Sequence, residues 1–498
     1  MEARPKMRPR RSAWRWAGLA AAAALLGSCA VGPDFVRPTP PVAERYTRDP
    51  LPDTTIAADG RAQHFSPDAA LTDGWWRLFG SRPLDAAVRR AIANNPTLQA
   101  AEATLRESQD SLRAGQGVFY PHAAADLDAR RQRTAPLQQG VNTPSTVFNL
   151  VTLSGSVSYV LDVFGGERRT VEVLRAQSDY QRYAGIAAYM ALSANVVDTC
   201  IARAGYAAEI RATEELVALE EQQVQIAEEQ VRAGTASYSA VLVARSLVAG
   251  NRAQLAPLRQ KVDQAGDLLA ALEGVVPSKS DLPDIELTAM TLPADLPVSL
   301  PSELVRQRPD ILSAEATLHA SSASIGVATA AMFPSFSLGG TYGASASRLG
   351  DLSRASGRFW SIGPSATVPL FQGGTLWFSR KAAIDAFQES QANYRQVVLV
   401  AFAQVADTLN ALRHDAEALQ AQVDARSAAD DALKLLQANY RAGLAPFTDV
   451  LAADVLAHQA SLAYLQAVAQ RQQDTVALYV ALGGGWWNAA GTAGAGDS

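Results

Sequence analysis

The chain repeats itself, and this duplication constrains its fold more than any other feature of the sequence. Three landmarks recur 213 residues later: Pro96-Thr97-Leu98 as Pro309-Asp310-Ile311, the run Ala-Glu-Ala-Thr-Leu at 101–105 again at 314–318, and Pro121 as Pro334. Two later landmarks recur at slightly smaller offsets: Phe164-Gly165-Gly166 as Phe371-Gln372-Gly373-Gly374, and Arg232-Ala233-Gly234 as Arg441-Ala442-Gly443. Such self-similarity predicts two copies of one structural unit of about two hundred residues.

Each unit is predicted to contain one helix, two strands and then a pair of long helices. The first helix of each unit is expected at residues 84–118 and 310–331, in segments rich in Ala, Glu and Gln. The long helices are expected at 168–231 and 376–440, and their antiparallel partners at 237–272 and 448–482. Gly234 and Gly443 suit the left-handed caps where each long helix ends and the chain reverses.

The second long helix carries an apolar seam with spacings of three and four residues. Its members are Tyr394, Val398, Ala401, Val405, Leu409, Leu412, Ala416, Leu419 and Val423. This spacing is typical of a coiled coil. At ~1.5 Å per residue, a helix of roughly 60 residues reaches about 90 Å, which is far longer than a globular domain needs.

The predicted strands alternate between apolar and small polar side chains with a period of two. The apolar sets are Leu153, Val157, Tyr159, Leu161 and Val163, then Phe336, Leu338, Tyr342 and Ala344, then Trp360, Ile362, Ala366, Val368 and Leu370. A weaker set, Ala123, Ala125, Leu127 and Ala129, follows Pro121. Segments of about ten residues with this contrast fit a membrane barrel, with lipid outside and water inside. Because four strands leave unpaired edges that lipid does not tolerate, the sequence predicts an oligomer that closes the barrel.

The N-terminal residues predict a secretory signal at 1–28. A basic region is followed by an apolar stretch at 17–26, which is too short to span a bilayer, and no later run is predicted to be a helical membrane anchor. The signal ends in Leu26-Gly27-Ser28-Cys29, which resembles a lipobox, although a plain signal peptide with an incidental cysteine is the alternative. Cys200 is the only other cysteine, so a lipidated Cys29 leaves no intrachain disulfide. Ala30, in place of an Asp that would favour inner-membrane retention, favours the outer membrane.

The sequence predicts no catalytic or metal site. None of the five histidines lies at metal-ligand spacing, and no phosphate-binding glycine loop is present. The signal carries a net charge of +5, so its removal takes the chain from −5 to about −10, which is untypical of a nucleic-acid-binding protein. We therefore expect no enzyme activity, no nucleic-acid partner and no cofactor apart from the lipid on Cys29.

Four segments, taken together in order, resemble the TolC-like outer-membrane efflux family, and its NodT-type lipoprotein branch in particular. They are 29–35 (Cys-Ala-Val-Gly-Pro-Asp-Phe), 75–80 (Trp-Trp-Arg-Leu-Phe-Gly), 304–311 (Leu-Val-Arg-Gln-Arg-Pro-Asp-Ile) and 440–451, from Tyr440-Arg441-Ala442-Gly443-Leu444 to Thr448-Asp449-Val450-Leu451. The resemblance covers nearly the whole mature chain. It implies an α+β membrane protein that forms a trimer, with four strands per protomer in one twelve-stranded β-barrel continued by a long periplasmic α-helical barrel.

The resemblance also implies a function and partners. The protein would be the exit duct of a tripartite efflux pump for drugs or other small toxic molecules, opened by a periplasmic adaptor. An inner-membrane transporter of the RND, major-facilitator or ABC class would supply the energy. The domains would be a signal peptide (1–28), a lipidated extended segment (29–83), the first repeat (84–276), an equatorial linker (277–301), the second repeat (302–483) and a flexible tail (484–498).

Several site residues follow from this resemblance. Asp449, six residues after Gly443, matches a lumen-facing carboxylate that threefold symmetry would repeat around a constriction; a carboxylate favoured by a helix N-terminus is the alternative. Tyr440 matches a tyrosine that holds the closed state, and Asp454 is a further aperture candidate without support from the family spacing. The adaptor-docking tips would include Arg232 and Gly234, with Arg441 and Gly443 in the second hairpin.

The sequence departs from the family pattern at the tips. Ala445 stands where relatives often carry a charged gating residue, Ala452 replaces a second lumen carboxylate, and Ala240 stands where the first hairpin would match Asp449. The closed aperture is therefore expected to depend on fewer or different polar links. Two other functions remain as alternatives: a general porin would not need the long helical hairpins, and a periplasmic coiled-coil scaffold would not need the strands.

Overall fold

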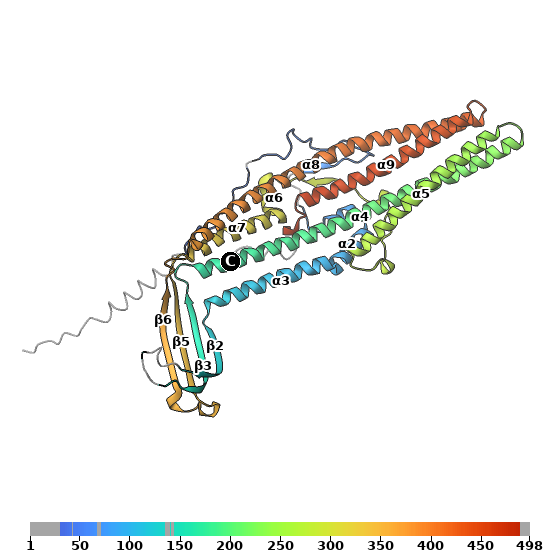
Figure 1. Ribbon diagram of the computed structural model, residues 1–498. Coiled ribbons are helices and arrows are strands. Elements are labelled where there is room, and N and C mark those ends of the chain that lie inside the picture. The colour runs from blue at the N-terminus through green and yellow to red at the C-terminus, as the bar shows by residue number, and fades with distance from the viewer. Residues whose placement is uncertain (1–29, 42, 67–70, 135–139, 141–143, 489–498) are drawn as a thin grey trace, which may run out of the picture. The chain divides into compact units, whose positions relative to one another are not determined.

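The computed structural model describes residues 30–41, 43–66, 71–134, 140 and 144–488 (Figure 1). Its helices are η1 (Trp75–Phe79), α2 (Arg82–Asn94), α3 (Pro96–Gln116), η2 (Gly117–Phe119), α4 (Gly166–Arg232), α5 (Tyr238–Leu272), η4 (Pro277–Lys279), η5 (Leu287–Ala289), α6 (Pro301–Gln307), α7 (Pro309–Ala330), η6 (Leu349–Asp351), η7 (Ala355–Gly357), α8 (Thr375–Arg441), α9 (Phe447–Ala481) and η8 (Trp486–Asn488). Its strands are β1 (His64–Ser66), β2 (His122–Arg133), β3 (Val147–Leu161), β4 (Asp295–Pro297), β5 (Ser335–Ala346) and β6 (Arg358–Thr367).

The structure separates into two compact units that cut across both sequence repeats. Unit 1 combines the described residues within 1–37, 106–180 and 314–394, and unit 2 combines those within 38–105, 181–313 and 395–498. Each unit therefore takes equivalent parts from both repeats. The duplication produces an interleaved fold instead of two consecutive domains.

Unit 1 contains a four-stranded antiparallel sheet in the order β2-β3-β5-β6. Its register places the predicted apolar sets on one face: Leu127 is paired with Leu153, and Tyr342 with both Gly155 and Trp360. Trp360 is 72% exposed and Tyr342 is 60% exposed, so this face is uncovered within the protomer. The outer edges of β2 and β6 have no strand partner among the described residues.

The long helices begin and end within two residues of the predicted positions. The seam predicted for α8 is confirmed, because its residues from Tyr394 to Leu419 are at most 5% exposed and only Val423 is partly buried. One helix, α4, has a window apolar enough to cross a membrane by length and composition. Half of that window is buried in the protein, as in a core helix.

The α4–α5 hairpin of unit 2 carries a ladder of ion pairs along its exposed side. The pairs are Glu214 with Arg259 (2.8 Å), Glu221 with Arg252, and Glu228 with Arg245 (2.7 Å). From one pair to the next, the residue number of the glutamate rises by seven and that of the arginine falls by seven, which is the pattern of an antiparallel coiled coil. Exposed pairs of this kind contribute at most about 1 kcal/mol each, so the ladder chiefly fixes the register of α4 against α5.

The single helix predicted at 84–118 is wrong in one respect, because the chain breaks at Asn95 between α2 and α3. Asn95 is extended (φ −64°, ψ 122°), since a following proline disfavours helical geometry in the preceding residue. Its side-chain oxygen accepts hydrogen bonds from the backbone N–H groups of Thr97 (2.9 Å) and Leu98 (3.1 Å), which caps α3. Arg308 is likewise extended before Pro309, between α6 and α7.

The hydrophobic core of unit 2 is assembled from η1, α2, α4, α8 and α9 together with the linker between the repeats. Trp75 is at its centre, 2% exposed and stacked on Tyr479 with ring centroids 5.4 Å apart. Three-residue strands β1 and β4 pair in parallel and join the N-terminal segment to the linker. The predicted extended segment and the predicted equatorial linker thus supply part of this core.

Candidate functional site

The two hairpin ends in unit 2 have the same backbone design. At the first, the N–H of Thr235 donates to the carbonyl of Gln230 (2.9 Å), and at the second, the N–H of Leu444 donates to the carbonyl of Asn439 (2.8 Å). These bonds satisfy the last carbonyls of α4 and α8. Gly234 (φ +71°) and Gly443 (φ +73°) are left-handed with open space around them, so the backbone angle, not crowding, requires glycine.

Tyr440 links the two hairpins. Its hydroxyl is 2.6 Å from Nε2 and 2.9 Å from Oε1 of Gln230 on α4, so it can accept from one atom or donate to the other. Its ring packs against Phe447 at the start of α9, with centroids 5.5 Å apart. A side chain of α8 therefore ties the end of α4 to the beginning of α9. The sequence carried no signal for Gln230 beyond its position two residues before Arg232.

A cavity of about 630 Å³ lies beside this link. Its walls include the amide side chains of Gln222, Gln223, Gln230 and Gln437, together with Leu219, Ile226, Thr235, Tyr440, Arg441, Gly443, Ala445, Phe447 and Val450. The lining is mostly uncharged, and Arg441 supplies its positive charge. The cavity is therefore an amide-rich groove between the ends of the two hairpins.

The predicted docking residues are at these ends and are exposed. The Arg232 side chain is 74% exposed, and a long contact of 3.9 Å joins it to Glu229. Arg441 is also exposed while lining the groove. Two cations and two turn glycines therefore lie at the ends of the two hairpins.

Asp449 is exposed in the first turn of α9. Its carboxylate accepts a weak hydrogen bond from the Thr448 hydroxyl (3.4 Å) and benefits from the positive end of the helix dipole. Asp454 differs, because it is only 3% exposed and its Oδ2 has no hydrogen-bond partner in the described part of the chain. A buried carboxylate does not suit a water-facing aperture.

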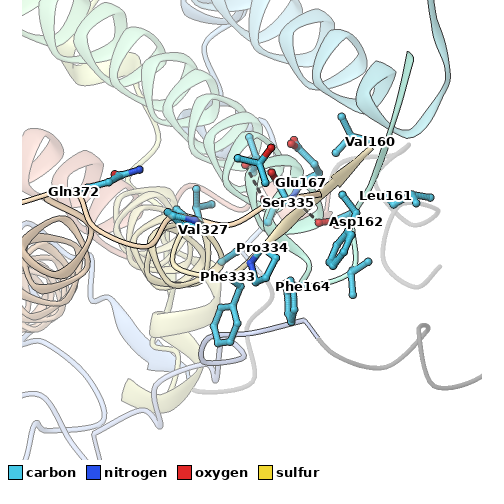
Figure 2. A pocket seen from close by; sticks show the side chains of 18 residues that line it. Val160, Leu161, Asp162, Phe164, Glu167, Val327, Phe333, Pro334, Ser335 and Gln372 are labelled. Carbon is cyan, nitrogen blue, oxygen red and sulfur yellow. Dashed lines mark hydrogen bonds between the residues drawn. The ribbon is translucent and has the colours of Figure 1, made fainter. Parts of the chain in front are cut away.

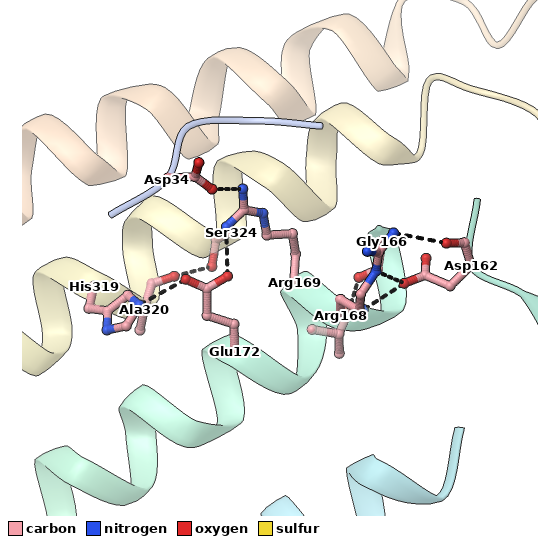
Figure 3. A network of polar contacts seen from close by, with 10 residues as sticks. Asp34, Asp162, Gly166, Arg168, Arg169, Glu172, His319, Ala320 and Ser324 are labelled. Atoms are coloured by element: carbon pink, nitrogen blue, oxygen red, sulfur yellow. Dashed lines mark hydrogen bonds and ion pairs between the residues drawn. The ribbon is translucent and has the colours of Figure 1, made fainter. Parts of the chain in front are cut away.

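In unit 1, residues 30–37 form an N-terminal strap along α4 and α7 (Figure 3). The N–H of Val31 donates to the carbonyl of Phe164 (3.0 Å), and Asp34 Oδ1 accepts from Arg169 Nη2 (2.6 Å). Phe35 stacks on His319 with centroids 4.3 Å apart, and Arg37 Nε donates to Glu315 Oε1 (2.6 Å). The strap is therefore held at four successive points.

Arg169 and Glu172 form the centre of this network (Figure 3). Arg169 bridges Asp34 and Glu172 (2.7 Å), and Glu172 also contacts His319 Nε2 (2.8 Å). Burial opposes ionisation of Glu172, but hydrogen bonds from Arg169 and His319 hold its pKa below the usual value. The strap therefore docks against a fixed negative charge paired with a buried guanidinium.

A cavity of about 400 Å³ lies where the strands of unit 1 meet its helices (Figure 2). Apolar side chains such as Leu161, Phe164, Phe333 and Phe336 form much of its wall, and Phe164 stacks on Phe333 with centroids 4.7 Å apart. Asp162 accepts hydrogen bonds from the N–H groups of Glu167 (3.0 Å) and Arg168 (2.9 Å) and so caps the start of α4. Ala30 lies beside Gly165 at this junction.

Replacing Gly32 with alanine should release the strap. A Cβ atom at Gly32 would lie 2.5 Å from the Cα of Gly326 on α7, and its φ of +98° already disfavours a side chain. We expect hydrogen exchange at the Val31 amide to accelerate at least about tenfold, which corresponds to about 1.4 kcal/mol. Gly60→Ala is the control, since Gly60 has φ +73° but nothing within 4 Å. Equal protection of the Val31 amide in both variants would show that the close approach of Gly32 to Gly326 does not hold the strap in place.

Cys29, the predicted lipidation site, lies outside the described residues. Among the residues that the structure describes, no group of three or more His, Cys, Asp or Glu side chains is arranged to hold a metal ion. The second cysteine, Cys200, is buried, and burial is the main cause that raises the pKa of its thiol to about 12.

Comparison with known proteins identifies relatives along nearly the whole chain. Probable efflux pump outer membrane protein TtgC of Pseudomonas putida is 31% identical over 95% of this chain and 96% of the relative. Cation efflux system protein CusC of Escherichia coli is 27% identical over 93% and 96%, and Nodulation protein T of Rhizobium leguminosarum is 29% identical over 93% and 92%.

Solved structures agree. The outer-membrane channel OprN has a TM-score of 0.81 and 28% identity, covering 92% of this chain and 100% of that one. The open state of the Neisseria gonorrhoeae MtrE outer membrane channel has a TM-score of 0.75 and 27% identity, covering 92% and 98%. The family described as outer membrane efflux protein matches residues 87–275 and 300–484, one match for each repeat. The chain therefore belongs to the outer membrane efflux protein family, whose members are channels of the outer membrane.

Proposed function

We propose that the protein is the exit duct of a tripartite efflux pump that exports drugs or other small toxic molecules. The observation that supports this most directly is the combination, in one chain of an efflux family, of a sheet with an uncovered apolar face and two long helical hairpins. The sheet suits lipid on one side, and the hairpins are longer than a simple pore requires. The duct itself is passive, and an inner-membrane transporter of the RND, major-facilitator or ABC class supplies the energy.

The duct is proposed to be a homotrimer. The free edges of β2 and β6 leave backbone groups that a bilayer does not solvate, so each edge must pair with another copy. Three protomers would close a twelve-stranded barrel, continued by a helical barrel in the periplasm. A lipid on Cys29 would anchor the chain in the outer membrane, and the strap at 30–37 would carry that anchor to the junction of strands and helices.

The hairpin ends are proposed to form the aperture. The exposed carboxylate of Asp449 would be repeated three times around it, which favours cations over anions. The Tyr440–Gln230 link would hold the second hairpin against the first in the closed state. The α8–α9 hairpin is the better candidate for movement, since the described residues show no ion-pair ladder there like the one joining α4 to α5. Contact of a periplasmic adaptor with Arg232 and Arg441 would trigger opening.

Planar bilayer recordings on the purified mature protein test this proposal. We expect a small, cation-selective conductance, and we expect Asp449→Ala to lose most of that selectivity because the ring of charge is removed. Asp431→Ala is the matched control, since Asp431 is an exposed α8 carboxylate whose partner is Lys434 on the same helix. Large, permanently open currents would support a general porin instead. Unchanged selectivity in Asp449→Ala would remove Asp449 from the aperture.

A further inference from the structure

Four polar residues of unit 2 are buried near the groove that Gln223 of α4 and Val450 of α9 both line. Glu220 on α4 is 2% exposed, Asp454 on α9 is 3% exposed, and Asn251 on α5 and His458 on α9 are each 8% exposed. Asn251 Nδ2 donates to Glu220 Oε1 (2.7 Å). Three further atoms, Glu220 Oε2, Asp454 Oδ2 and His458 Nε2, have no hydrogen-bond partner in the described part of the chain.

Among the residues that the structure describes, no cation forms an ion pair with either of these two carboxyl groups. The charged neighbours on α4 and α5, including Glu221 and Arg252, pair with each other on the exposed side of that hairpin. On α8, Lys434 pairs with Asp431 on the same helix, and both side chains are exposed. On α9, Asp449 is exposed, and burial lowers the pKa of His458, which favours its neutral form. Two ionised carboxylates in this place would leave buried negative charge unbalanced, which is strongly unfavourable.

We propose that Glu220 and Asp454 together hold at least one proton at neutral pH, and that this proton, by removing the repulsion between two buried charges, locks α9 of the second hairpin against α4 of the first. A protonated carboxyl is neutral, so it can remain buried near the other carboxyl without the repulsion that two negative charges would produce. As pH rises, the proton leaves to bulk water and the two charges repel. The contact between the two hairpins then weakens, and these are the hairpins that must separate when the proposed aperture opens.

The pKa shifts of Glu220 and Asp454 are in the direction that the proposed protonation requires. Burial, reinforced by the charge of Asp454, raises the pKa of Glu220 to about 7 although Asn251 opposes the shift. Burial raises the pKa of Asp454 to about 6. Because both folded pKa values are raised, the folded contact binds more protons than the separated one. Its stability is fully present at pH 4 and is lost as pH rises through 6–7.

Infrared spectroscopy of the full-length purified protein tests the proton directly. Wild type at pH 6 should show a protonated-carboxyl C=O band that loses intensity in the double variant Glu220→Gln/Asp454→Asn. Glu221→Gln is the control, since Glu221 is the exposed neighbour of Glu220 and pairs with Arg252. Equal band intensity in wild type and the double variant would overturn the proposal. The single variants Glu220→Gln and Asp454→Asn provide the same comparison if the double variant does not fold.

Hydrogen exchange of α9 tests the lock. After correction for the intrinsic pH dependence of exchange, wild-type protection near residues 450–458 should fall at least about tenfold from pH 5 to pH 8, the factor of one pKa unit. The double variant should show flat protection, and a retained pH dependence would contradict the lock. The functional meaning of this lock, that the hairpins separate when the duct opens, rests on the proposed function. Both measurements, however, detect the proton and the lock in the folded chain whether or not it conducts. An absence of conductance would therefore refute the duct without affecting either result.

Discussion

Replacing Trp75 with alanine should lower the free energy of unfolding of unit 2 by about 3–5 kcal/mol, the range for removing a large aromatic side chain from a packed core. Trp75 is 2% exposed, stacks on Tyr479, and meets the rings of Trp76 (5.9 Å) and Phe79 (6.4 Å) edge-on. These contacts join η1, which precedes the first repeat, to α9 at the end of the second. The cavity left by alanine would therefore weaken the contact between two segments that are far apart in the sequence and are held together only by packing.

Local hydrogen exchange measures this effect best. The N–H of Thr291 donates to the carbonyl of Phe79 (2.9 Å), so its protection reports whether η1 stays docked on the linker. Leu78→Ala is the matched control, since Leu78 is in the same short helix but is 48% exposed. Its cost should stay within about 0.5 kcal/mol, as for other surface substitutions. Similar losses in both variants would show that Trp75 does not organise this core.

Replacing Arg471 with methionine should cost at least about 1–3 kcal/mol, the penalty for leaving a buried polar group without its hydrogen-bond partner. Arg471 is 1% exposed. Its guanidinium donates to Gln63 Oε1 (3.1 Å), Thr55 Oγ1 (3.2 Å) and the carbonyl of Arg61 (3.4 Å). Methionine fills much of the space but leaves these acceptors buried without a donor. Arg471→Lys should recover only part of the loss, because an ammonium group lacks the planar fork.

The loss of folding stability caused by Arg471→Met should also depend on pH. Burial and the neighbouring Asp474 raise the pKa of Asp415 to about 7, while the charge of Arg471 opposes that shift. A raised folded pKa stabilises the fold below the ordinary value near 4, and this contribution disappears as pH rises through 7. Without Arg471 the pKa of Asp415 rises further, so the destabilisation should be larger at pH 8 than at pH 6. Thermal unfolding of wild type and Arg471→Met at both pH values measures the difference, and an equal loss would contradict it.

Local pattern was enough to predict the elements of this fold. The period of two placed the apolar residues of the strands on one face, and the register of β3 and β5 brings Tyr342 level with Gly155 on that face. The three–four spacing predicted the buried seam of α8 from Tyr394 to Leu419. Both patterns depend on how successive side chains project from a regular backbone, which sequence position alone specifies. The break at Asn95 is also encoded in the sequence, by Pro96, although the surrounding helical pattern continues on both sides of it.

The candidate site depended more on tertiary contact. Asp454 and Asp449 are five residues apart on one helix, yet Asp454 is buried and Asp449 is exposed. Nothing in the local sequence distinguishes them, because burial on α9 is decided by the helices packed on each side. Gln230 likewise belongs to the candidate site only through its hydrogen bond with Tyr440, 210 residues away along the chain.

By itself, the sequence determined the duplication, the order of helices and strands, the direction of each apolar face and the turns at Gly234 and Gly443. These are properties of short segments, set by backbone angles, side-chain spacing and the special freedom of glycine. Only the tertiary structure decided that the repeats interleave into two units, that residues 30–37 lie strapped along α4 and α7, and that the charge of Asp454 acts on the buried Glu220. Those contacts join residues far apart in the chain, and their energies come from desolvation and close packing, which exist only once the helices are side by side.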